Sequence, residues 1–226
     1  SRRGCAMSNY VLKYSRGAEV KYISHLDFVR MFHRSVRRSG LPMSFSQGFN
    51  PHPIMTVAMP LSVGVTSDCE YLKIGFDGDF SEDEIKSKLN IALPPGFEIL
   101  RARKTEGKEL DFAKLDRAEY TVETELESTF VPDIESFLAN DEITVMKKSK
   151  SGVKEADIKP HIYELKVIRA DGVYVDFDMT VSAGNLYNLK PETVLDAIEK
   201  YQPGFKRVFT AVHRKKILAG DRELLE

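Results

Sequence analysis

Residues 24–40 read SHLDFVRMFHRSVRRSG, and this stretch predicts one helix whose two ends are both marked. Ser24 followed three residues later by Asp27 is a capping-box pattern, in which the serine side chain accepts a hydrogen bond from a backbone amide in the first turn. Gly40 is typical of the residue that ends a helix, because glycine adopts the left-handed conformation without strain. We therefore expect a helix that begins after Ser24 and ends before Gly40.

This helix has an apolar face and a basic face. At about 100° per residue, the large apolar side chains and the arginines fall on separate arcs. The apolar arc carries Phe28, Val29, Phe32 and Val36, and the basic arc carries Arg30, Arg34, Arg37 and Arg38. The apolar arc predicts a face packed on a sheet, which leaves the arginines on the outer face.

The segments around this helix alternate between strand and helix patterns. Runs of β-forming residues predict strands at residues 10–14, 54–59, 70–76 and 97–103, and a serine-capped amphipathic pattern predicts a second helix at 81–93. The order β-α-β-β-α-β is that of the ferredoxin-like arrangement, in which two helices cover one face of a four-stranded antiparallel sheet.

A second round of similar elements follows. We expect strands at residues 120–126, 142–148, 163–168, 173–179 and 206–212, and helices at 132–139 and 191–201. The sequence therefore predicts an α+β protein with two tandem ferredoxin-like domains, at 7–104 and 119–226, joined by a polar linker at 105–118 and with an insertion near 149–161 in the second. Residues 1–6 (SRRGCA) precede a plausible initiator, Met7, and are interpreted as a remnant outside the native chain.

Composition points to a globular protein of the cytoplasm. The 226 residues are 42% hydrophobic, contain two cysteines and include no run of 18 apolar residues. The N-terminus lacks the pattern of a secretory signal, so we expect a cytoplasmic location and no membrane partner. Charge is unevenly distributed along the chain. Residues 1–67 hold nine of the 33 Lys and Arg residues but only two of the 34 Asp and Glu residues. This asymmetry indicates an anionic partner for the first third.

The arginines of the first helix are the strongest candidate for binding. Guanidinium groups present planar sets of donors that match phosphate oxygens, which makes RNA a candidate ligand. The alternative is a solvated helix face, or internal ion pairs to the acidic second half of the chain.

Residues 45–53 (FSQGFNPHP) form the second candidate site. Gly48, Asn50 and the two prolines predict an ordered turn. In such a turn, aromatic and neutral polar side chains suit an unpaired nucleotide, namely Phe49 and His52 with Ser46, Gln47 and Asn50. The alternative is that Phe45 and Phe49 plug the core.

Catalytic motifs are scarce. His25 and His52 are the only pair considered for general acid–base chemistry, as in metal-independent RNA cleavage, although His25 on the apolar arc also suits a hydrogen-bonded core histidine. No metal-ligand spacing and no nucleotide-binding motif is present, so we expect no metal and no cofactor.

Two segments together, SHLDFVRMFHRSVRRSGLPMSFSQGFNPHP at 24–53 and AMPLSVGVTSDCEYLKI at 58–74, resemble the radical SAM-linked family, a group of uncharacterised bacterial proteins. The similarity continues more weakly through DIKPHI at 157–162. Members of that family are encoded beside, or fused to, cobalamin-dependent radical SAM enzymes, often near a ribonuclease. The resemblance implies RNA metabolism and a radical SAM enzyme as partner. The chain lacks the CxxxCxxC motif of the enzyme itself, so it would be the companion.

The preferred interpretation is a non-catalytic RNA-binding or substrate-presenting accessory protein, with tRNA or rRNA among the RNAs considered. An endoribonuclease or RNA-modifying enzyme that uses His25 and His52 is the first alternative. A protein-interaction module that docks through the uncharged run at residues 41–67 is the second.

Overall fold

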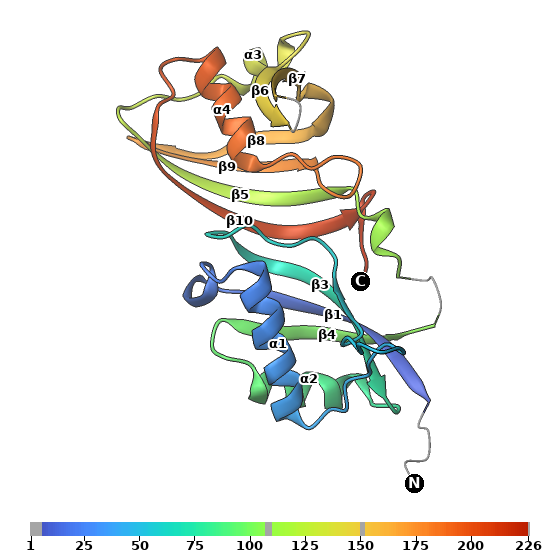
Figure 1. Ribbon diagram of the computed structural model, residues 1–226. Coiled ribbons are helices and arrows are strands. Elements are labelled where there is room, and N and C mark those ends of the chain that lie inside the picture. Colours follow the sequence, from blue (N-terminus) through green and yellow to red (C-terminus); the bar gives the residue numbers. More distant parts are fainter. Residues whose placement is uncertain (1–5, 107–109, 150–151, 226) are drawn as a thin grey trace. The chain divides into compact units, whose positions relative to one another are not determined.

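The computed structural model describes residues 6–106, 110–149 and 152–225. The chain divides into two compact units: unit 1 holds the residues up to Phe112 and those from Glu223 onward, and unit 2 is Ala113–Arg222. Each is a mixed α+β unit with antiparallel strands (Figure 1). Among the described residues, none of the helices combines the length and the apolar character needed to span a bilayer.

Unit 1 contains the elements that the sequence predicts, in the predicted order. They are β1 (Met7–Arg16), the 3-10 helix η1 (Ala18–Val20), α1 (His25–Ser39), β2 (Met55–Val57), β3 (Thr66–Asp77), α2 (Glu82–Ala92) and β4 (Phe97–Thr105). The ends of α1 are confirmed: Ser24 accepts a hydrogen bond of 3.2 Å from the amide of Asp27, and Gly40 has φ 75°. Strand β3 is longer than expected and begins at Thr66.

The sheet of unit 1 has the strand order β4-β1-β3-β2, and all its neighbours are antiparallel. Alternate residues of β1 and β3 join one hydrophobic core with side chains from both helices, so α1 and α2 cover the same face. From α1 the core takes Phe28, Phe32 and Val36, as the apolar arc predicts.

Unit 2 has a four-stranded main sheet and a separate hairpin. Its elements are η2 (Phe112–Lys114), which begins one residue before the unit, β5 (Arg117–Leu126), α3 (Ile134–Ala139), β6 (Thr144–Ser149), β7 (Gly152–Asp157), η3 (Lys159–His161), β8 (Ile162–Asp171), β9 (Tyr174–Ser182), α4 (Pro191–Tyr201), β10 (Arg207–Ala219) and β11 (Arg222–Glu223), which ends one residue after the unit. The main sheet runs β10-β5-β9-β8. The strand predicted at 142–148 is present as β6, but it pairs with β7 in a two-stranded sheet of its own.

The sequence boundaries proposed for the domains stay predictions. The expected linker at 105–118 includes the last residue of β4, η2 and the start of β5, and its residues 107–109 lie outside the described part of the chain. Residues 1–5 of the expected remnant and residues 150–151 of the expected insertion also lie outside it.

The C-terminal residues complete unit 1. The carboxylate of Glu223 forms an ion pair with Lys13 on β1, and the Tyr71 hydroxyl on β3 donates a hydrogen bond to it at 3.3 Å. The side chains of Lys13 and Glu223 are only 17% and 14% exposed, and Leu225 is buried. Burial raises the pKa of Tyr71, so its hydroxyl remains a donor.

Candidate functional site

The four arginines predicted to bind RNA, here called the arginine row, are all exposed on α1. Arg30 lies 3.4 Å from the carboxylate of Asp27, in an exposed pair that contributes little to stability. The side chains of Arg34 and Arg37 have no hydrogen bond or ion pair with any residue that the structure describes. These two guanidinium groups are therefore available to an incoming anion.

Arg38 differs from the other three arginines, because it stabilises the fold of unit 1. Its guanidinium donates a hydrogen bond of 2.6 Å to the carbonyl of Ala92 at the end of α2, and another of 3.0 Å to the hydroxyl of Ser35. A cation beside carbonyls at a helix C-terminus is favourable. Part of the hydrogen-bonding capacity of Arg38 is thus already used.

The segment at residues 45–53, here called the Phe49 loop, is an ordered turn that projects from the sheet. Its base is closed by two hydrogen bonds, from the Ser46 amide to the His52 carbonyl at 2.8 Å and from the His52 amide to the Ser46 hydroxyl at 2.9 Å. Gly48 has φ 129°, which favours glycine. The interpretation of the phenylalanines as core plugs is wrong: Phe45 is 49% exposed, and Phe49 is fully exposed at the tip.

The other polar side chains proposed for the Phe49 loop also lie at the surface. Gln47, Asn50 and His52 are exposed, and Ser46 is half-buried because its hydroxyl accepts the bond that closes the loop. The neutral hydrogen-bonding groups and the Phe49 ring are therefore accessible together.

The second half of α1 and the Phe49 loop lie at the same end of unit 1. Only a few residues separate Gly40 from Met43, which forms a bridge to Phe76 near the end of β3. The Phe49 loop then leaves and rejoins the sheet between Ser44 and Ile54, which bond to each other and to Gly75. The Phe49 loop thus follows, along the chain, the half of α1 that carries Arg34 and Arg37, and its base is held beside Gly75 on β3.

The two candidate histidines are not brought together. His25 is the first residue of α1, whereas His52 belongs to the loop that follows the other end of the helix. A helix of 15 residues is roughly 22 Å long. His25 is also exposed, so its interpretation as a core histidine is wrong. The partly buried histidine of this helix is His33, whose pKa is lowered by burial.

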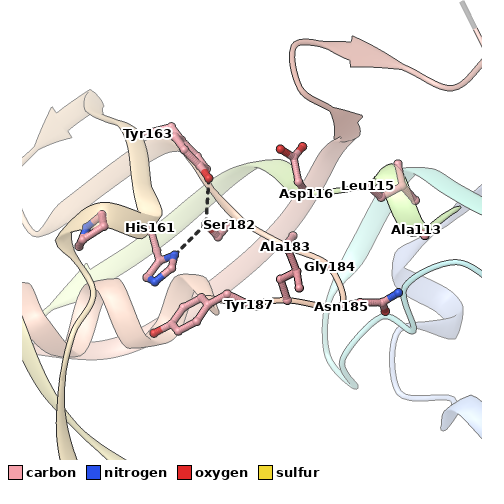
Figure 2. Close-up of a pocket in the computed structure, with 12 residues that line it drawn as sticks. Ala113, Leu115, Asp116, His161, Tyr163, Ser182, Ala183, Gly184, Asn185 and Tyr187 are labelled. Atoms are coloured by element: carbon pink, nitrogen blue, oxygen red, sulfur yellow. Dashed lines mark hydrogen bonds between the residues drawn. The ribbon is translucent and has the colours of Figure 1, made fainter.

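A cavity in unit 2, here called the Ser182 pocket, was not predicted from the sequence (Figure 2). Its volume is about 320 Å³, and the buried Ser182 lies at the end of β9. The Ser182 hydroxyl is 3.0 Å from His161 Nδ1 and 3.1 Å from the Tyr163 hydroxyl, and both side chains point toward it in Figure 2. One buried hydroxyl thus holds two ring side chains in place.

Aromatic contacts fix the orientation of the rings that line this pocket. The rings of His161 and Tyr187 are stacked, with 3.4 Å between their centroids and an interplanar angle of 3°. The guanidinium carbon of Arg117 lies 4.2 Å from the centroid of the Tyr163 ring, a cation–π geometry. Tyr163 lines both the Ser182 pocket and a neighbouring cavity that contains Arg117.

The loop between β9 and α4 closes one side of the Ser182 pocket because Gly184 lets it approach the backbone near β5. Gly184 has φ 149°, and a Cβ at this position would lie 2.3 Å from the carbonyl oxygen of Leu115. The Ala183 amide donates to the Asp116 carbonyl at 2.8 Å, and the Leu189 amide donates to the Ser182 carbonyl at 2.8 Å. These bonds hold the intervening residues, including Tyr187, over the pocket.

The DIKPH segment at residues 157–161 places His161 in the lining of the Ser182 pocket. The Asp157 carboxylate accepts hydrogen bonds of 2.9 Å from the amides of Ile143 and Lys159, which fixes the turn before His161. The proline in this segment is a sequence signal for a fixed turn. The residue with which His161 shares a hydrogen bond, Ser182, lies 21 residues further along the chain, so the sequence does not indicate the pair. Within the described residues, no group of three His, Cys, Asp or Glu side chains could hold a metal ion.

Several solved structures are similar to the chain. One is the crystal structure of a Cbf5-Nop10-Gar1 complex, with a TM-score of 0.48 and 11% identity over 93% of this chain and 48% of that one. A second is an H/ACA RNP bound to a substrate RNA containing 2'-deoxyuridine, with a TM-score of 0.48 and 10% identity over 93% and 47%. A third, the archaeal box H/ACA sRNP Nop10-Cbf5 complex, has a TM-score of 0.43 and 12% identity over 92% and 46%. The chain spans about half the length of these chains.

No curated protein matches the chain. A family model does match, over residues 9–191, and this range includes α1, the Phe49 loop, and all the side chains that hydrogen-bond or stack within the Ser182 pocket. Its description is that of an uncharacterised protein conserved in bacteria, DUF2344. Because the match covers well over half of the sequence, the chain belongs to this bacterial family.

Proposed function

We propose that the chain is a non-catalytic RNA-binding accessory protein that contacts phosphates through the arginine row and an unpaired base through the Phe49 loop. The observation that carries the proposal is the state of Arg34 and Arg37, which are exposed and have no carboxylate partner among the described residues. Phosphate contacts by such side chains release counterions and give affinity that falls steeply with salt.

The Phe49 loop supplies the second contact. An exposed phenylalanine on a loop closed by hydrogen bonds offers a fixed ring on which a base can stack. Gln47, Asn50 and His52 lie on the same loop and are exposed, so neutral hydrogen bonds to the base edge can accompany the stacking. This combination suits single-stranded or looped RNA, of which tRNA and rRNA are examples.

The proposed architecture is a pair of ferredoxin-like domains. The strand order β4-β1-β3-β2 in unit 1, with one helix after β1 and one after β3, supports this assignment. The order β10-β5-β9-β8 in unit 2 supports the same arrangement with β6 and β7 as an inserted hairpin. As its partner we propose a radical SAM enzyme, and the support for this is the sequence resemblance alone.

A labelled single-stranded RNA and a labelled tRNA, titrated by fluorescence anisotropy at several salt concentrations, test the RNA assignment. The double variant Arg34→Ala/Arg37→Ala should bind each RNA more weakly at low salt. For the single strand, its slope of log affinity against log salt should be shallower by about 1.4, because each lost phosphate contact removes about 0.7. Phe49→Ala should weaken binding of the single strand at all salt concentrations.

The matched control is Arg101→Ala/Lys206→Ala, which removes the same charge from exposed side chains that are not part of α1. Its salt slope should stay close to that of the unmodified protein. If the α1 variant binds like the unmodified protein at low salt, or if the control loses as much affinity, the arginine row is not the RNA contact.

A protein-docking role is the second candidate. It is favoured by the exposure of apolar side chains in the uncharged run at residues 41–67, where Val63 is 57% exposed in addition to Phe45 and Phe49. Co-purification of a radical SAM enzyme with the chain after nuclease treatment, abolished by Phe49→Ala but not by the α1 double variant, would support docking in place of RNA binding.

A further inference from the structure

The Ser182 pocket lies in unit 2 and takes no part in the contacts proposed for α1 and the Phe49 loop. Its volume of about 320 Å³ is near the lower end of the roughly 300–1,000 Å³ of small-molecule sites. A ligand of the size of one heterocyclic ring system fits that range.

The pocket presents hydrogen-bonding groups whose direction can reverse. In one arrangement the Tyr163 hydroxyl donates to Ser182, and Ser182 donates to His161 Nδ1. In the other, His161 carries its proton on Nδ1 and donates to Ser182, which then donates to Tyr163 and leaves the tyrosine hydrogen for a ligand. In both arrangements the buried serine hydroxyl keeps both of its hydrogen-bond partners. The pocket can therefore bind a ligand group that donates a hydrogen bond or one that accepts it.

The pocket is also lined by flat π surfaces. The stacked rings of His161 and Tyr187 lie on one side of Ser182 and Tyr163 on the other, as Figure 2 shows. Every nucleobase has a π face that stacks on aromatic side chains and an edge with donors and acceptors. Aromatic rings beside hydroxyl groups that can either donate or accept a hydrogen bond therefore match a nucleobase.

The charges at the pocket exclude a phosphate as the main recognised group. The described residues that line it include no Lys or Arg, and the carboxylate among them is that of the exposed Asp116. A phosphate placed here would be close to the Asp116 carboxylate, and the guanidinium of Arg117 lies in the neighbouring cavity, where it contacts the Tyr163 ring. The recognised part of the ligand is therefore neutral.

We infer that the Ser182 pocket binds one unpaired nucleobase, which either an RNA strand or a free nucleoside can supply. The base stacks on Tyr163 or Tyr187 and bonds through its edge to the trio of Ser182, His161 and Tyr163. For the RNA source, the inference rests on the proposed function. For the nucleoside source, it is independent of that function.

The riboside of 2-aminopurine is a suitable probe, because its fluorescence is quenched when the base stacks and the chain contains no Trp to obscure the signal. We expect saturable quenching by the protein. Tyr163→Ala and Tyr187→Ala should each weaken binding by about 5- to 100-fold, the range for loss of one stacking side chain. Ser182→Ala should weaken it by about fivefold, as for one lost hydrogen bond.

Tyr174→Ala is a matched control, because Tyr163 and Tyr174 are both 45% exposed, lie on the paired strands β8 and β9, and each have an arginine over the ring. It should leave quenching unchanged. Tyr163→Phe keeps the ring and loses the hydroxyl, so it should retain most of the stacking. It also provides a second variant at this position in case Tyr163→Ala does not fold. The 5'-monophosphate of the probe should bind no more tightly than the riboside.

A short RNA with one internal 2-aminopurine separates the two sources of the base. Quenching of either probe that depends on Tyr163 and Tyr187 supports the pocket, and the probe that responds identifies the source. Absence of saturable quenching with both probes, an equal effect of Tyr174→Ala, or tighter binding of the monophosphate overturns the inference. If Arg34→Ala/Arg37→Ala leaves RNA affinity unchanged while the riboside still binds, the proposed function fails and the pocket stands.

Discussion

Gly184 is the residue at which backbone geometry most directly determines the shape of a candidate site. Its φ of 149° is open to glycine and costly for other residues, and the Leu115 carbonyl occupies the space that a side chain would need. The Ser182 pocket therefore depends on a position that contributes no side chain to it.

Gly184→Ala should lower the free energy of unfolding by at least about 2 kcal/mol, because the strain of the backbone and the clash with Leu115 act together. Chemical denaturation followed by circular dichroism measures this change. Gly172→Ala is the matched control: its φ is 61° and its Cβ would meet no atom within 4 Å, so it should cost only about 1–2 kcal/mol. Equal losses for the two variants would contradict the role of the Leu115 contact.

The positions of individual residues on an element could be predicted from the sequence better than their surroundings in the folded chain. The arginine arc followed from helical periodicity and is exposed, as expected. The surface positions of Phe45 and Phe49 could not be predicted, because an aromatic ring in a turn is compatible with either a plug or a tip. The hydrogen bonds between Ser46 and His52, which close the base of the loop and leave Phe49 at its tip, form only in the folded turn.

At the scale of elements, α4 and β10 are joined by a charged cluster around Arg207. Glu199 accepts hydrogen bonds from the Arg207 amide at 2.9 Å and from its Nε at 2.8 Å, and Asp196 accepts one from its guanidinium at 2.5 Å. Hydrogen bonds from Arg207 lower the pKa of Glu199. The cluster thus fixes the short turn between the helix and the strand.

Glu199→Gln should lower the free energy of unfolding at neutral pH by about 1–2 kcal/mol, since it removes the charge from hydrogen bonds to a mostly buried arginine. The folded-state pKa of Glu199 lies below its unfolded value. Its contribution is therefore complete above the usual glutamate pKa and is lost as the pH falls through the folded pKa. Unfolding measured between neutral and acidic pH should show a smaller acid-induced loss in the variant. Parallel curves for the two proteins would refute this assignment.

The elements with local signals were predictable, and those defined by distant pairing were not. Helix α1 is delimited by Ser24 and Gly40, which both lie within or beside it. By contrast, β6 pairs with β7 and not with the main sheet, and the residues of β7 have no sequence pattern that predicts a strand. The strands predicted at 163–168 and 173–179 are present as β8 and β9, but their predicted bounds stop short of His161 and Ser182, the pair that forms the Ser182 pocket.

At the scale of the whole molecule, the chain leaves unit 1 at Phe112 and returns to it at Glu223. The returning carboxylate meets Lys13, Tyr71 and Cys69, whose thiol lies 3.8 Å from it. Unit 1 is therefore built from two separate parts of the sequence.

Glu223→Ala should lower the free energy of unfolding by about 2–4 kcal/mol, because it leaves the mostly buried Lys13 ammonium without this carboxylate. Hydrogen exchange should also become faster in β1 and β3. Asp221→Ala is the control, since Asp221 is 92% exposed in its pair with Arg117 and should cost less than about 1 kcal/mol. Unchanged exchange in β1 and β3 would mean that the returning segment contributes nothing to unit 1.

The return of Glu223 and Leu225 also imposes an order on biosynthesis. A ribosome makes β1 and β3 early but adds these last partners only after all of unit 2 has been translated. At roughly 5–20 residues per second, the nascent first unit waits on the order of ten seconds with Lys13 unpaired from its carboxylate. The last folding step of unit 1 therefore cannot precede the translation of unit 2.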